Sequence, residues 1–163
     1  MKDKDKYSIE LLRLKESEKK LFSAKYYFKK SNLYFDQLLF ALKILSEQGT
    51  ALRFVRDEDF DDKELDNLIP IVIEISIGGN IDHIPIARDI LFKYRHNNIV
   101  KKTLPKMVLK YLDSSDDFIY RRIAELLLEL NYKELKNSFI NKCKKSENKD
   151  IVEIYNDFYE KYK

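Results

Sequence analysis

The sequence predicts an all-α fold built from consecutive antiparallel helix pairs. Residues 103–130 read as two amphipathic helices joined by a short polar turn, and related motifs recur along the chain at intervals of 33 to 37 residues. The 163-residue chain has only three glycines and three prolines, which argues against a β-rich fold with many tight turns. Its length suits one domain with a sizeable core, so we expect a single helical-repeat domain over 1–163.

The central pair starts with a helix over 104–112. Thr103 is its expected N-cap, and Pro105 lies in the first turn, where a backbone N–H has no helical partner to lose. The polar run 113–116 ends this helix, and a second helix follows over 117–130. Because the second helix is apolar around most of its circumference, it needs neighbours on more than one side. Four of its charged side chains remain for solvent: Arg121, Arg122, Glu125 and Glu129.

Related motifs supply those neighbours. Pro70 and Pro105 follow similar apolar residues at an offset of 35, and an apolar run of helical length follows each of them. Asp82, Asp117 and Asp150 each open an apolar helix and stand 35 and then 33 residues apart. This drifting interval indicates that the turns vary in length while the helix pairs persist.

The repeated pattern has a family resemblance. Residues 64–163 resemble the HEAT-like family of α-solenoid repeats. The residues that carry the resemblance are the two prolines, Asp117 in a turn, and Arg121 or Arg122 in the following helix. The resemblance implies a short right-handed α-solenoid with about three helix pairs in this region. The likeness has departures, because the helix after Asp82 lacks the arginine and the last pair lacks the proline. It therefore implies an architecture and no particular ligand.

The N-terminal segment 1–49 is expected to form two capping helices, since the end repeats of a solenoid are usually atypical. The first helix is predicted over 8–30, with Ser8 as its N-cap. The second is a cleaner amphipathic helix that is expected to end at Gly49, a typical C-terminal stop. Residues 50–56 are compatible with either a short helix or a loop.

The remaining predicted helices complete three pairs. They cover 67–77, 82–94, 132–144 and 150–162. The first of these is rich in β-branched residues and by periodicity alone also fits a strand, but its match to 104–112 favours a helix.

The most unusual stretch is the acidic segment, residues 57–66, which holds seven acids and one base in a chain of net charge +3. One interpretation is a solvated connection that places acids at the start of the next helix, where the helix dipole favours them. The other is a contact surface for a basic protein partner, with Phe60 as an apolar anchor, because closely spaced like charges repel and a cationic partner relieves that repulsion. The candidate partner-binding residues are Asp57, Glu58, Asp59, Phe60, Asp61, Asp62, Glu64 and Asp66.

No sequence pattern indicates catalysis. His83 and His96 are the only histidines and Cys143 is the only cysteine, so neither a zinc site of ordinary spacing nor an internal disulfide is expected. Neighbouring lysines favour a lowered pKa for Cys143, but without a matching histidine pattern we interpret it as an ordinary helix residue. Phosphate-binding and hydrolase motifs do not occur in the sequence. We therefore expect a protein that is not an enzyme, with no cofactor and no catalytic, cofactor-binding or metal-binding residues.

Nucleic-acid binding is the alternative class. The segment 25–30 mixes lysines with aromatic residues, as single-strand binders do, and further bases precede it: Arg13, Lys15, Lys19 and Lys20. Against this interpretation, the chain has no tryptophan, its net charge is small, and Glu16 and Glu18 alternate with the bases. We therefore rank nucleic acid below a protein as the expected partner.

Stacked helix pairs present a curved surface, so the expected role is a protein-binding scaffold. In size and composition the chain resembles small helical-repeat immunity proteins, which neutralise bacterial toxins. An acidic surface of this kind suits a basic nuclease toxin, because it can occupy a groove meant for phosphates. The N-terminus lacks a signal-peptide pattern and no apolar run is long enough to span a membrane, so no membrane partner and a cytoplasmic location are expected.

Overall fold

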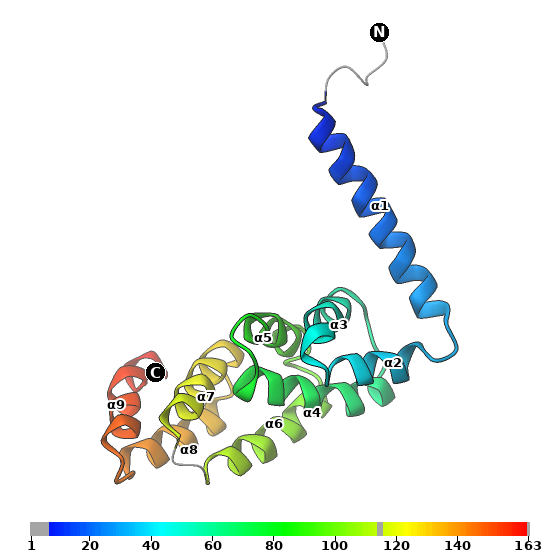
Figure 1. Ribbon diagram of the computed structural model, residues 1–163. Coiled ribbons are helices and arrows are strands. Elements are labelled where there is room, and N and C mark those ends of the chain that lie inside the picture. The colour runs from blue at the N-terminus through cyan, green and yellow to red at the C-terminus, as the bar shows by residue number, and fades with distance from the viewer. Residues whose placement is uncertain (1–6, 114–115, 163) are drawn as a thin grey trace. The chain divides into compact units, whose positions relative to one another are not determined.

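The computed structural model describes residues 7–113 and 116–162, and the described residues contain helices and no strand (Figure 1). The prediction of an all-α fold is therefore confirmed. In chain order the elements are α1 (Ile9–Lys30), α2 (Tyr34–Ala41), α3 (Leu45–Asp57), α4 (Asp62–Gly78), α5 (Ile84–Lys93), α6 (Asn98–Tyr111), α7 (Asp117–Leu130), α8 (Lys133–Lys144), α9 (Lys149–Phe158) and the short 3-10 helix η2 (Glu160–Tyr162). None of the helices in the described ranges is both long and apolar enough for a transmembrane span.

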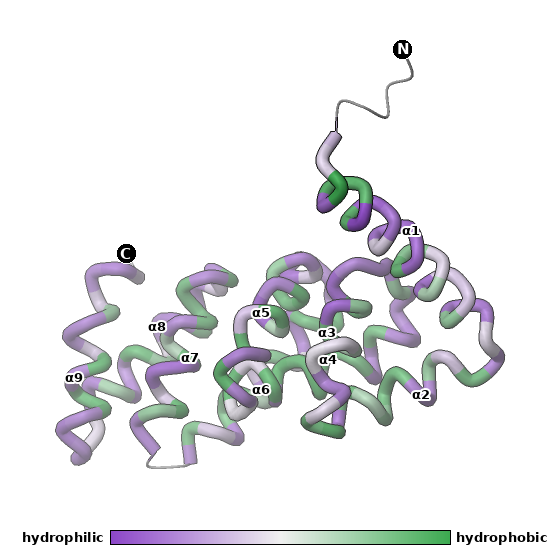
Figure 2. Tube along the Cα trace, turned by 45° about the horizontal axis from the view of Figure 1, so that its top comes forward, coloured by the Kyte–Doolittle hydropathy of each residue, from purple (hydrophilic) through white to green (hydrophobic). Residues whose placement is uncertain are grey.

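The chain divides into two compact units, residues 1–40 and 41–163. In the first unit, the side chain of Ser8 accepts a hydrogen bond from the backbone N–H of Leu11 at 3.3 Å, which confirms the predicted N-cap of α1. No residue of α1 is buried, and polar and apolar positions alternate along it (Figure 2). The capping role assigned to 1–49 stays a prediction.

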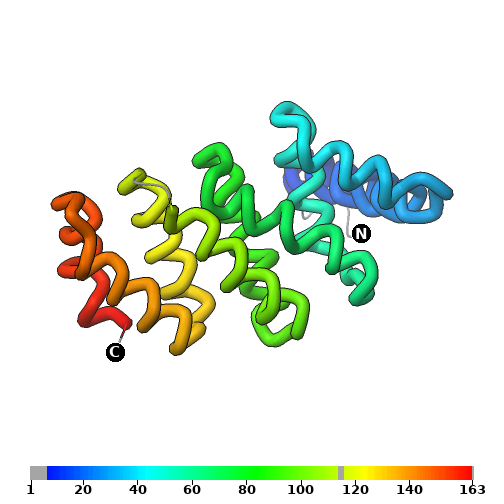
Figure 3. Tube along the Cα trace, turned by 90° about the horizontal axis from the view of Figure 1, so that it is seen from below, coloured from blue at the N-terminus to red at the C-terminus, as the bar shows by residue number. Residues whose placement is uncertain are grey.

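In the second unit the helices form two rows. Helices α4, α6 and α8 lie in one row, and α3, α5, α7 and α9 lie in the other (Figures 1 and 3). Along the rows, α4 packs on α6, α5 packs on α3 and α7, and α7 packs on α9, while α4–α5, α6–α7 and α8–α9 are consecutive contacting pairs. This order of packed helices is compatible with a helical-repeat architecture.

Helices α4 and α7 contribute many of the core residues of the second unit. Helix α4 buries its predicted apolar run, so the segment that also fitted a strand is a helix. Helix α7 has the predicted bounds, and the side chain of Asp116 caps it by accepting from the backbone N–H groups of Phe118 and Ile119. The fully buried core side chains of these two helices include Leu65, Leu68, Ile69, Ile73, Ile77, Ile123, Leu126 and Leu127.

The prediction that Gly49 ends a helix is wrong. The chain breaks earlier, after α2, and α3 runs from Leu45 through Gly49 to Asp57, so the ambiguous residues 50–56 are helical. Gly49 is buried, and a Cβ atom there would lie 3.0 Å from Nε2 of His83. The missing side chain therefore makes room for an imidazole ring that comes from the end of another helix.

The prediction that Thr103 caps a helix is also wrong. Helix α6 starts at Asn98, and the side chain of Asn97 caps it by accepting from the backbone N–H of Ile99 at 2.7 Å. Pro105 consequently lies inside α6, and Pro70 lies at a similar depth inside α4. Each proline removes the hydrogen bond that its N–H would have donated to the carbonyl four residues earlier. The sequence pattern located both helices, but it placed the prolines a full turn too close to their starts.

The charged side chains of α7 were predicted to be left for solvent, and Glu125 and Glu129 are indeed 44% and 45% exposed, but both also bond a neighbouring helix. Arg88 of α5, with a side chain only 11% exposed, bonds Glu125 at 2.9 Å and Glu129 at 3.3 Å. It also donates to the backbone carbonyl of Arg122 at 3.1 Å. These charges fasten α5 to α7 and are thus part of the packing between helix pairs.

Candidate functional site

The acidic segment spans the end of α3, a short connection and the first turn of α4. Its first helical acids have a structural role, as one of the two interpretations predicted. The side chain of Asp61 accepts from the backbone N–H of Glu64 at 2.9 Å, and the side chain of Glu64 accepts from the backbone N–H of Asp61 at 3.1 Å. This capping box satisfies two backbone donors at the start of α4.

The end of α5 fixes the connection between α3 and α4. Lys93 Nζ donates to the backbone carbonyl of Glu58 at 2.6 Å and forms an ion pair with Asp59 at 2.9 Å. The hydroxyl of Tyr94 accepts from the backbone N–H of Phe60 at 3.3 Å. Burial by itself lowers the pKa of Lys93, but the hydrogen bonds and charges of Asp59 and Tyr94 together outweigh it, and the pKa lies above its usual value. Lys93 therefore holds the acidic segment as a cation.

Phe60 does not serve as the predicted exposed anchor. It is only 8% exposed, and its ring packs edge-on against Phe54, with 6.4 Å between the ring centroids. The reason is that the connection between the helices turns this side chain inward, onto the last turns of α3. Phe60 belongs to the core, and its packing on Phe54 holds the backbone of the acidic segment against α3.

The structure leaves five aspartates of the segment exposed on its surface. Asp57 pairs with Arg56 at 2.9 Å, and Asp62 accepts from the side-chain amide of Asn97 at 3.0 Å. The side chain of Asp59 is 93% exposed although it contacts Lys93. The exposed set is Asp57, Asp59, Asp61, Asp62 and Asp66, and Glu58 and Glu64 are half-buried. The structure thus keeps a carboxylate-rich surface on a segment held by several independent contacts.

A second charged surface, not predicted from the sequence, lies on α6 and α8. Helix α6 contains four lysines and no acid, and the stretch 133–145 contains five lysines and one acid, Glu134. One of these lysines, Lys136, is buried and donates to Asn131 Oδ1 at 2.7 Å and to the Tyr162 carbonyl at 3.2 Å. The exposed lysines, here called the lysine face, are Lys101, Lys102, Lys106, Lys110, Lys133, Lys142, Lys144 and Lys145.

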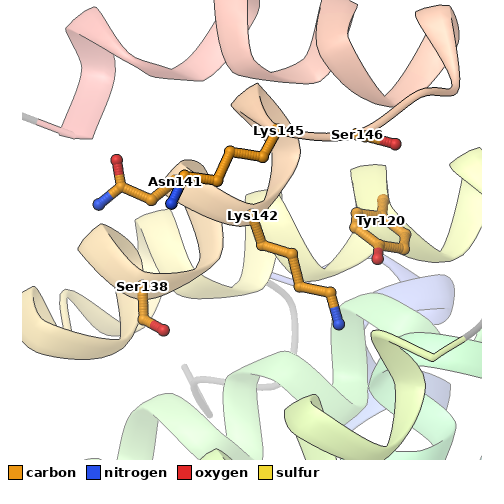
Figure 4. Close-up of a pocket in the computed structure, with 6 residues that line it drawn as sticks. All are labelled: Tyr120, Ser138, Asn141, Lys142, Lys145 and Ser146. Carbon is orange, nitrogen blue, oxygen red and sulfur yellow. The ribbon is translucent and has the colours of Figure 1, made fainter.

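Two adjoining cavities border the lysine face. One, of about 520 Å³, is lined by Lys101 and Pro105 of α6 and by Lys133 and Ser138 of α8, among others. The other, of about 380 Å³, also includes Ser138 and continues along α8 past Asn141 to Lys142 and Lys145 (Figure 4). Lys142 and Lys145 extend in different directions from the end of α8 (Figure 4). The shared serine makes the two cavities neighbours along one helix.

The lysine excess of α6 was visible in the sequence, because 98–111 has four bases and no acid. The sequence did not predict that these lysines form one surface with those of α8, because the two sets become neighbours only when the two helices occupy the same row (Figure 3). In contrast, α7 and α9 in the other row contain six acids and three bases. The rows therefore sort the charge of the C-terminal helices by sign.

The sulfur and imidazole groups show no sign of an active site. Cys143 is fully buried, and burial raises the pKa of its thiol to about 12, so the neighbouring lysines do not activate it. His83 Nδ1 lies 2.7 Å from Oε1 of Gln48 and ties the start of α5 to α3. Within 7–113 and 116–162, no group of three or more histidine, cysteine, aspartate or glutamate side chains is placed to hold a metal ion.

Comparison of the chain with protein-family models, curated proteins and solved structures gives no match.

Proposed function

We propose that the protein is a non-enzymatic scaffold that binds a basic protein partner through its acidic segment. We further propose that its rows of helices form a short right-handed α-solenoid of HEAT-like pairs. Two rows of consecutive, contacting helix pairs support this arrangement. Such a scaffold offers a preformed surface, so little ordering free energy is lost when a partner binds.

The observation that carries the proposal is that the acidic segment has exposed carboxylates on a backbone that is held in place. Its five exposed aspartates lie on backbone that is held by the capping box, by Lys93 and by the buried ring of Phe60. Fixed like charges create a local negative potential, which attracts a cationic surface and speeds its association.

The class of partner that fits best is a basic toxin domain, with the scaffold acting in the cytoplasm as its immunity protein. A nuclease toxin carries positive charge where it grips phosphates, and an acidic segment of about ten residues matches such a groove in charge. Binding there would block the substrate without any chemistry on the part of the scaffold.

The proposal is tested by capture from lysate of the native organism at low and moderate salt. The baits are the wild type, the triple variant Asp59→Asn, Asp62→Asn, Asp66→Asn, and a control triple variant Asp82→Asn, Asp89→Asn, Glu153→Gln. The control removes the same charge from exposed positions elsewhere, and Asp61 is left intact so that α4 keeps its cap.

We expect the wild type and the control to retain the same basic protein and the acidic-segment variant to lose it. Stopped-flow mixing with that protein should show an association rate that falls steeply with salt for the wild type and for the control. Equal retention by all three baits would contradict a role for the acidic segment.

The alternative, nucleic-acid binding by the basic aromatic N-terminal helix, is favoured by one observation. Helix α1 buries none of its residues, and it exposes the rings of Tyr26 and Tyr27 beside Lys30, whose Nζ lies 5.7 Å from the Tyr26 ring centroid. Exposed rings next to cations are typical of stacking platforms for single strands. Replacing both tyrosines with serine should abolish single-strand binding if α1 is the site.

A further inference from the structure

We propose that the lysine face of α6 and α8 is a second binding surface, which holds the phosphate backbone of a nucleic acid. This site is independent of the acidic segment and of α1. It would bind without reading sequence, because its groups are lysine ammoniums, hydroxyls and amides rather than base-reading arginines.

The charge of the surface is the first step. Eight exposed lysines gather on α6 and on residues 133–145, where Glu134 is the only acid, and Asp113 Oδ1, just after α6, lies 3.9 Å from Lys142 Nζ. In a chain with a net charge of only +3, this is a strong local excess. A surface of one sign attracts a polymer of the opposite sign and releases the counterions condensed on it.

The spacing of the lysines is the second step. Lys102, Lys106 and Lys110 are exposed and recur every fourth residue, so they project from one side of α6. At 1.5 Å per residue, their Cα atoms stand about 6 Å apart and the row is about 12 Å long. A single small anion would engage one or two of these ammoniums. A chain of regularly repeated phosphates engages all of them.

The composition of the surface separates a nucleic acid from an acidic protein. Protein interfaces are enriched in aromatic residues and arginine and are depleted of lysine. Neither α6 nor α8 contains arginine, and their aromatic side chains are withdrawn, with Tyr111 half-buried and Phe139 fully buried. Lysine serves well as a point charge for phosphate, whereas it anchors a protein interface poorly.

The cavities beside the lysines supply neutral polar groups. Ser138 and Asn141 line the same cavity as Lys142 and Lys145 (Figure 4). Hydroxyl and amide side chains of this kind make many of the contacts to phosphate and sugar oxygens in known complexes. The two adjoining cavities thus offer a path along α8 next to the row of charges on α6.

The acidic segment lies at the start of α6, so its charge acts mainly on Lys101 and Lys102 in the first turns of that helix. The hydrogen bond from Asn97 to Asp62 places the segment at the first residue of that helix. Lys106 and Lys110 follow about 14 and 20 Å further along the axis, at 1.5 Å per residue. Both distances exceed the Debye length of about 10 Å at 0.1 M salt, so solvent ions screen the repulsion.

The test measures binding of a fluorescein-labelled 20-base-pair DNA duplex by fluorescence anisotropy between 25 and 200 mM salt. The variant is Lys102→Gln, Lys106→Gln, Lys110→Gln, and the matched control is Lys43→Gln, Arg53→Gln, Lys161→Gln, which removes the same charge from exposed positions outside both the lysine face and α1. We expect the α6 variant to bind at least ten-fold more weakly and to lose about 2.7 from the slope of log affinity against log salt, at about 0.9 per contact. The control should stay within about two-fold of wild type, as expected of charges outside the contact surface.

A charge-preserving variant, Lys102→Arg, Lys106→Arg, Lys110→Arg, guards against a folding artefact and should keep the wild-type affinity. Three results would overturn the proposal. They are an absence of duplex binding by the wild type at 25 mM salt, equal losses in the α6 variant and the matched control, and displacement of the duplex by polyglutamate at equal charge concentration. The second result would assign the binding to net charge rather than to the lysine face, and the third would indicate an acidic protein partner.

Discussion

Arg122 of α7 donates from Nη1 to the backbone carbonyls of Ile77 and Gly79, at 3.1 and 3.3 Å. The last carbonyls of a helix have no partner within the helix, so this guanidinium satisfies acceptors at the end of α4 that would otherwise need water. The contact joins residues more than 40 positions apart and ties one helix pair to the next. It makes the end of α4 dependent on α7.

Replacing Arg122 with methionine should destabilise the protein by about 1–3 kcal/mol, because it strands partly buried carbonyls. The matched control is Arg121→Met, which removes a surface pair with Asp157 and should cost less than about 1 kcal/mol. Urea denaturation followed by circular dichroism gives both values. Equal losses would mean that the Arg122 contacts add nothing beyond a surface charge.

Removing the N-cap of α4, which lies inside the acidic segment, should destabilise the protein. Asp61→Ala is expected to lower the free energy of unfolding by about 0.5–2 kcal/mol, because the backbone N–H of Glu64 loses its acceptor. Asp66→Ala, at an exposed position further along α4, should change it by less than about 0.5 kcal/mol. If thermal melts gave the same shift for both variants, the capping box would have no energetic role.

Adjacent glycines at the end of α4 should respond in opposite directions. A Cβ atom at Gly78 would meet nothing within 4 Å, so Gly78→Ala should stabilise the protein by about 0.4–1 kcal/mol through the unfolded state. A Cβ atom at Gly79 would lie 2.4 Å from the backbone carbonyl oxygen of Ile75, so Gly79→Ala must displace backbone and destabilise. Melting temperatures of the two variants compare them directly, and a rise for both would contradict the close approach.

Stability should fall in alkaline solution because of Cys143. Burial raises the pKa of its thiol from the model-compound value of 9.0 to about 12, so the unfolded chain releases the proton first as pH rises. The stabilisation is complete below about pH 9 and is lost between about 9 and 12, at up to about 1.4 kcal/mol per pH unit. Urea titrations at pH 8 and 10 should show a smaller fall for Cys143→Ala than for wild type. Identical falls would assign the alkaline loss to other groups.

Local signals in the sequence were enough for the elements with strong caps and clean stripes. The polar turn that ends in Asp116 and the apolar residues after it predicted the bounds of α7. Helix α4, in contrast, starts at Asp62, five residues before the predicted start at 67, because the capping box of Asp61 and Glu64 extends it into the acidic segment. These features depend on neighbours within one or two turns.

Features that depend on distant contacts were not predictable. Gly49 carries a local stop signal, but its helix continues because the bare backbone accepts the ring of His83 from a later helix. The inward turn of Phe60 likewise depends on Phe54 and on the hydroxyl of Tyr94. The same holds for the candidate sites. The acidic segment could be predicted because its residues are contiguous in the sequence, whereas the lysine face could not, because it is assembled from two helices.

The separation of positive charge on the lysine face from negative charge on the acidic segment gives the second unit a permanent electric dipole. In dilute salt, the positive end of one molecule attracts the negative end of another, and this contact joins two different patches. Contacts between unlike patches do not close on themselves, so they extend into open chains rather than stopping at a dimer. The protein should therefore be least soluble in pure water and should salt in as ions screen the dipole.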